Sequence, residues 1–144
     1  MTQLETPRPA VRTSLNSAPR TRALPTTDRI EALLESAGLE PRDGFWRHGD
    51  GVAAVLAGGG VFIGWLDVVW PGPGTPELQL RDVVHLPPGR LDELELTATL
   101  AVARERAESA RRSCRYCGER VVPGHMHSAD VCQGCAERHL GVVH

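Results

Sequence analysis

The residues best suited to chemistry are four cysteines near the C-terminus. They form two Cys-x-x-Cys pairs separated by the fourteen residues 118–131, and the four are Cys114, Cys117, Cys132 and Cys135. A two-residue spacer lets both sulfurs of a pair reach one ion, and four thiolates match the tetrahedral coordination that zinc prefers. In a cytoplasmic chain, as we expect this one to be, such pairs indicate metal before disulfide. The sequence therefore predicts one structural Zn²⁺ per chain.

Three other chemistries use cysteines at a similar spacing. A single iron in a rubredoxin-like site lies in an aromatic-rich fold, whereas Tyr116 is the one aromatic residue near these pairs. A thiol redox role would need a pair free of metal. Nucleases of the His-Asn-His type have an adjacent Asp-His pair and a longer insert, both absent here. His125 and His127 are expected in an exposed loop, and His139, four residues after Cys135, could replace a cysteine as ligand.

Short elements around the cysteines are expected to hold them in place. Gly118 suits a tight turn after the first pair, 121–131 fits a short hairpin, and 136–143 can form a helix that starts at the second pair. A knuckle, a hairpin and such a helix resemble the treble-clef class of zinc fingers, or a zinc ribbon if the helix is absent. The resemblance covers 114–143 and implies the metal site. Modules of these classes bind DNA, RNA or proteins, so the task is not implied.

Upstream of the cysteines, the pattern predicts a helix and then strands. Apolar residues at Ile30, Leu33, Leu34 and Ala37 follow the spacing of one helical face over 27–37, with Asp28 as its expected start. From 45 to 85, β-branched runs alternate with the turns 49–51 and 58–60. A rigid Pro- and Gly-rich loop is expected at 71–76. These signals predict an antiparallel β-meander of three to four strands.

A second, longer helix is expected over 91–112. Asp92, Glu93 and Glu95 lie in its first turn and Arg111 and Arg112 in its last, as the helix dipole favours. Its polar half, 103–112, is expected to project outward as a stalk. We therefore expect an α+β fold divided into a disordered tail (1–25), an α+β domain (26–112) and a small C-terminal zinc finger (113–144), called the finger below.

Charge is unevenly distributed along the chain. All sixteen basic residues are arginines, and 104–144 carries seven of them against five acidic residues, whereas 26–103 is acidic. Glu105, Glu108 and Glu119 lie among these arginines, and a zinc ion with four thiolates adds a net charge of about −2. Possible contacts to nucleic acid run from the long helix onto the first cysteine pair: Arg104, Arg111, Arg112, Arg115 and Arg120.

Two functional hypotheses follow from these features. The first is a non-catalytic zinc protein that contacts DNA or RNA as an adaptor or regulator. The alternative is a module whose finger docks on a partner protein. An enzyme is not expected, because no nucleophile with a base and no phosphate-binding glycine loop is present, and no small-molecule substrate is evident. No apolar run approaches the roughly 20 residues that cross a bilayer, so we expect no membrane contact.

Overall fold

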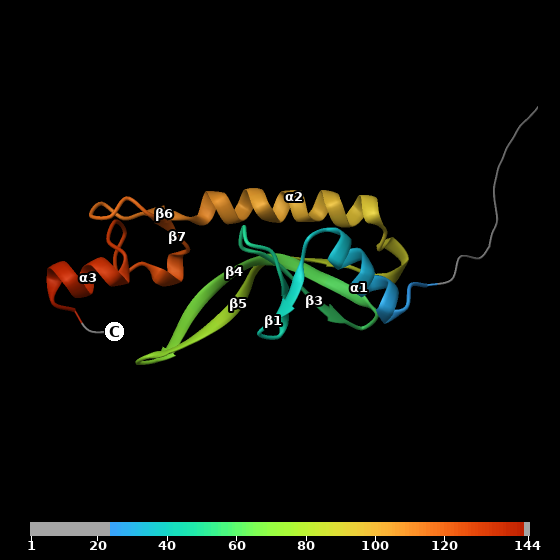
Figure 1. Cartoon of the computed structure of the whole chain (residues 1–144), viewed down its shortest axis with the longest axis horizontal. Coiled ribbons are helices and arrows are strands. Elements are labelled where there is room, and N and C mark those ends of the chain that lie inside the picture. The colour runs from blue at the N-terminus through green and yellow to red at the C-terminus, as the bar shows by residue number, and fades with distance from the viewer. Residues whose placement is uncertain (1–23, 143–144) are drawn as a thin grey trace, which may run out of the picture.

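The computed structural model describes residues 24–142. The expected tail, 1–25, lies outside this range except for its last two residues. The α+β class is confirmed: helices flank an antiparallel sheet, and a cysteine cluster follows the long helix (Figure 1). None of the helices in the described range has the length and apolar character needed to cross a membrane.

The first helix, α1 (Thr27–Ser36), agrees with its pattern apart from its start. Thr26, two residues before the expected Asp28 motif, is the N-cap, and its hydroxyl accepts from Arg29 N at 3.3 Å. Ile30 and Leu34 are buried against the sheet. Gly38, with φ of +91°, ends the helix because it adopts the left-handed conformation that most residues avoid.

The sheet has five strands in sequence order, each antiparallel to the next. They are β1 (Glu40–Arg42), β2 (Phe45–Arg47), β3 (Val52–Ala57), β4 (Gly60–Gly72) and β5 (Thr75–Leu86). The meander thus contains one strand more than expected, because β1 has only three exposed residues and includes a proline at the sheet edge. The loop expected at 71–76 is instead a tight hairpin, since Gly72 pairs with Thr75.

The long helix α2 (Glu93–Ala110) lies along the sheet, as Figure 1 shows, after the short 3₁₀ turn η1 (Pro88–Arg90). Asp92 caps it by accepting from Glu95 N at 2.8 Å. The face of α2 that packs on the sheet comprises Leu96, Leu100, Ala103 and Ala107. Burial of the last two shows that the expected projecting stalk is wrong, because the helix remains packed almost to its end.

The finger follows α2 directly. It contains β6 (Arg112–Ser113) paired with β7 (Arg120–Val121), the 3₁₀ turn η2 (Pro123–His125) and the helix α3 (Gln133–Leu140). Cys114, Val131, Cys135 and Ala136 form a small core of their own. The finger also packs on the sheet through η2, which lies against β4.

Candidate metal centre

The four cysteine sulfurs converge on one point. All four lie within 4.8 Å of one another, and the Sγ atoms of Cys117 and Cys132 are 4.0 Å apart. Tetrahedral zinc with Zn–S bonds of about 2.3 Å needs sulfurs roughly 3.8 Å apart, so the cluster fits one such ion. Cys114 and Cys135 are buried and Cys117 is exposed. The geometry supports metal binding at these four residues.

The first pair is held by the turn between β6 and β7. Cys114 N donates to Glu119 O at 2.9 Å, and Gly118 N donates to Cys114 O at 2.8 Å. Gly118 adopts φ of +77°, so it meets the need for a tight turn that its type predicts. Tyr116 N points at Cys114 Sγ at 3.4 Å, which favours the thiolate form.

The second pair is held by the start of α3. Cys132 is the N-cap residue and Cys135 lies in the first turn, so the helix fixes their separation. An isolated bridge between Met126 and Cys132 holds the chain that enters the helix. The hairpin expected over 121–131 is reduced to this bridge, because Pro123 directs the chain into η2.

The thiols have opposite electrostatic surroundings. Backbone N–H groups of Cys132 and Cys117 lower the pKa of the Cys114 thiol from 9.0 to about 6. Burial raises the pKa of the Cys135 thiol to about 12, and the neighbouring sulfurs add to this rise. Arg138 Nη2 donates to Cys135 Sγ at 3.1 Å and offers a cation to the thiolate that a metal would require. A metal ion must displace the proton of Cys135, whereas Cys114 is close to its ligating form.

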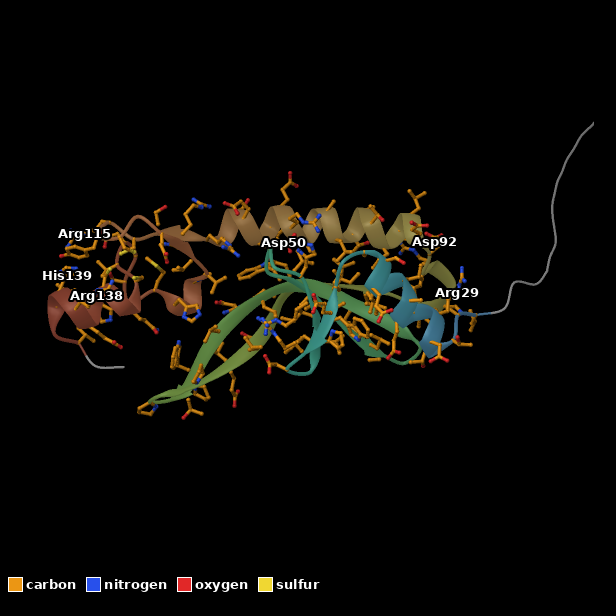
Figure 2. All side chains as sticks on the ribbon, in the orientation of Figure 1. Arg29, Asp50, Asp92, Arg115, Arg138 and His139 are labelled. Carbon is orange, nitrogen blue, oxygen red and sulfur yellow. The ribbon has the colours of Figure 1, made fainter. Side chains whose placement is uncertain are left out.

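No histidine joins this cluster within the described residues. His139 instead stacks on Tyr116, with ring centroids 4.6 Å apart and an angle of 14° between the rings. The guanidinium of Arg115 lies over the same tyrosine ring, 5.0 Å from its centroid. Figure 2 shows Arg115, Arg138 and His139 together at the end of the molecule far from α1. His125 lies at the boundary with the sheet, where it lines two cavities.

A buried carboxylate joins the finger to the sheet. Asp67 on β4 is 1% exposed, and its Oδ1 accepts from Gly124 N at 2.7 Å. Its Oδ2 accepts from Arg81 Nε at 3.2 Å. Gly124 O in turn accepts from Trp70 Nε1 at 2.8 Å and from Gln133 Nε2 at 3.1 Å. Sequence analysis missed this junction, because an aspartate in an apolar strand was its one local signal.

The five arginines considered for nucleic-acid contact differ in their surroundings. Arg104 pairs with Asp50, and it holds the pKa of that carboxyl below its usual value although burial opposes the shift. Arg120 pairs with Glu108 at 3.0 Å. Arg111 and Arg120 line one cavity, whereas Arg112 borders a different one. Arg115 remains half exposed on the finger, 3.8 Å from a carboxylate oxygen of Asp130.

Comparison with known proteins adds no family to this geometry. No protein-family model, no curated protein and no solved structure matches the chain. The function is therefore argued from the contacts described above.

Proposed function

We propose that this chain is a non-catalytic zinc-binding protein whose finger contacts single-stranded DNA or RNA. Support for zinc comes from the four convergent cysteine sulfurs, which match its preferred donors and geometry. With four protein ligands, the ion has no position left for water or substrate, which is typical of structural rather than catalytic zinc. We assign the finger to the treble-clef class, because one cysteine pair lies in a β turn and the other begins a helix.

The stack of Arg115, Tyr116 and His139 is the observation that carries the nucleic-acid proposal. Tyr116, the only tyrosine of the chain, lies within the first cysteine pair and is 43% exposed. Stacking on His139 holds its ring in one orientation, and Arg115 Nη2 donates to its hydroxyl at 3.3 Å. An exposed aromatic ring flanked by a guanidinium is a surface on which a nucleobase stacks while the arginine meets the adjoining phosphate.

Charge favours a single strand over a duplex as the partner. Arg104 and Arg120 are already paired with carboxylates, so fewer arginines are available for the several phosphate contacts that duplex binding needs. Stacking tolerates any base sequence, because every base has a π face. We therefore expect a large effect of the tyrosine ring, with a salt dependence that is smaller per phosphate contact than on a duplex.

The test is fluorescence anisotropy of zinc-loaded protein with labelled single-stranded RNA, single-stranded DNA and duplex DNA, at low and near-physiological salt. Tyr116→Leu should weaken single-strand binding by about tenfold, since stacking contributes roughly 1–3 kcal/mol per base. Arg29→Gln is the matched control, because Arg29 is exposed at the opposite end of the molecule (Figure 2). Zinc content should be unchanged in both variants. Equal binding by Tyr116→Leu and wild type, or no binding of any strand at low salt, would overturn the proposal.

The second candidate is a finger that docks on a partner protein. The exposed apolar side chain of Leu140, 47% accessible at the end of α3, favours it, as do the arginines already neutralised within the chain. This candidate predicts a stoichiometric complex that survives nuclease treatment and is lost in Leu140→Asp with zinc retained. A complex that disappears with nuclease would favour the first function instead.

A further inference from the structure

A basic cavity lies between part of the finger and the sheet. It has a volume of about 520 Å³ and is lined by residues from β1, β2, β4, β5, the end of α2 and the finger. Leu66, Val68 and Leu78 supply apolar surface from the sheet, and Val121 and Val122 supply it from the finger. Cavities of roughly 300–1,000 Å³ with this mixture of apolar surface and a few convergent polar groups are the usual form of small-ligand sites.

The charged groups of this cavity are strongly unbalanced. Four arginines line it against one acidic residue, and they are Arg42, Arg47, Arg111 and Arg120 against Glu40. Asp43 pairs with Arg47 at 3.0 Å and Glu108 with Arg120 at 3.0 Å. No carboxylate forms an ion pair with Arg42 or Arg111 within the described residues. Two of the four guanidinium groups that line the cavity therefore have no carboxylate partner within the described residues.

Arg111 supplies a second and independent observation. Its Nε is buried and has no hydrogen-bond partner, and its Nη2 reaches only the Asp50 carbonyl oxygen at 3.5 Å. A buried donor without an acceptor costs free energy. Because this Nε has no exposed surface, a ligand in the cavity reaches Arg111 through its Nη groups. A guanidinium offers parallel donors that match the two oxygens of a phosphate or carboxylate.

A more apolar hollow adjoins the basic cavity. It has a volume of about 670 Å³ and shares Arg47, Val68, Leu78 and His125 with the first, while Phe45 and Pro76 add apolar surface and Asp43 and Glu77 add two carboxylates. The two together form a groove that is more cationic in the first cavity and more apolar in the second. A ligand that fills both ends must carry a negative group on an apolar body.

We propose that this groove binds a small organic oxyanion, with a phosphate or carboxylate held by Arg42 and Arg111 and an aromatic or aliphatic body against Phe45 and Pro76. Within the described residues, neither arginine is paired with a carboxylate. The apolar hollow distinguishes this ligand from a bare inorganic ion. The site is separate from the Tyr116 stack and does not depend on the nucleic-acid proposal.

Isothermal titration of the zinc-loaded full chain with four probes tests the proposal. Phenyl phosphate and benzoate carry both parts of the ligand, inorganic phosphate carries the anion alone, and phenol carries the body alone. We expect saturable one-to-one binding of phenyl phosphate or benzoate, at least about tenfold tighter than either part alone. The tighter of the two probes identifies the preferred anionic group.

Variants then link binding to the arginines. Arg42→Gln should weaken the preferred probe by about tenfold, because it removes one charge-assisted contact and no ion pair of the fold. Arg111→Gln should have a similar effect, with thermal unfolding as a check because Arg111 also contacts the Asp50 carbonyl. Arg106→Gln is the control, since Arg106 is exposed on α2 and does not line the groove. Failure of both organic anions to bind, or affinity unchanged in Arg42→Gln and Arg111→Gln, would overturn the proposal.

Discussion

Gly124 offers the sharpest test of how the finger is attached to the sheet. A Cβ at this position would lie 1.8 Å from Val68 O and 2.8 Å from Asp67 Oδ1. Neither the strand backbone nor the buried carboxylate can move away without breaking the sheet or the bonds of Asp67. Since Gly124 does not have a positive φ, the obstacle to Gly124→Ala is steric contact alone. The substitution should therefore force η2 away from β4.

The magnitude follows from the hydrogen bonds that this movement breaks. The bond from Gly124 N to the Asp67 carboxylate is charge-assisted and contributes about 1.5–3 kcal/mol. The bond from Trp70 Nε1 to Gly124 O contributes about 0.5–1.5 kcal/mol. Asp67 retains Arg81 and the Val68 N–H, so it is not left without partners. Gly124→Ala should lower the free energy of unfolding by about 2–4 kcal/mol, or the melting temperature by roughly 10 °C.

Chemical denaturation measures the loss of stability, and hydrogen exchange of the segment 122–126 measures the loss of docking. Gly89→Ala is the matched control, because no atom lies within 4 Å of a Cβ built at Gly89 and its φ is not positive. It should change stability by no more than about 1 kcal/mol. Zinc content should be unchanged in both variants, since the cysteine cluster lies outside the clash. If Gly124→Ala unfolds like Gly89→Ala and protects 122–126 equally, the proposed attachment is wrong.

Three further predictions concern the metal and the acid range. Cys132→Ser should release zinc and unfold the finger while far-ultraviolet circular dichroism retains the signal of the α+β domain; one zinc per chain with unchanged affinity would contradict the four-thiolate site. Zinc affinity, measured by chelator competition, should fall as pH falls, because protons compete with the metal for the thiols. This competition is strongest at Cys135, whose thiol has a pKa of about 12, and weaker at Cys114, whose thiol has a pKa of about 6. Asp50 has a pKa below 3.8, so its stabilising contact with Arg104 is present at neutral pH and is lost as pH falls through this lowered pKa. Asp50→Asn should therefore reduce the loss of stability in acid. It should change the free energy of unfolding at neutral pH by no more than about 1 kcal/mol.

Sequence predicted the features that depend on local spacing. The approach of the two sulfurs within each cysteine pair follows from a two-residue spacer, which operates over one turn of backbone whatever the surrounding fold. The tight turn at Gly118 and the acidic start of α2 likewise depend only on neighbouring residues. The strand signals also predicted the antiparallel order, because short glycine-containing turns between β-branched runs join consecutive strands.

Features that depend on distant residues were not predictable in the same way. The projecting stalk was inferred from the polar residues of α2, but Ala103 and Ala107 are small enough to pack on the sheet and carry the polar residues with them. Asp67 and Gly124 are 57 residues apart, so no sequence pattern pairs them. The basic cavity was not predictable for the same reason, because Arg42 and Arg111, which both line it, are far apart in the sequence.

The metal centre, the attachment of the finger and the basic groove share one piece of backbone. Gln133 follows Cys132 at the start of α3 and donates to Gly124 O. The helix that zinc would hold in place therefore also holds Gly124, whose N–H donates to Asp67. Val122 and His125, which lie close to Gly124 in the sequence, form part of the groove wall. Removal of zinc should therefore loosen α3, release Gly124 and open the groove. The affinity of the protein for phenyl phosphate or benzoate should fall on chelator treatment and return when zinc is restored. Equal binding by the zinc-free protein would show that the groove is formed by the sheet alone, and that the metal stabilises the finger without reaching beyond it.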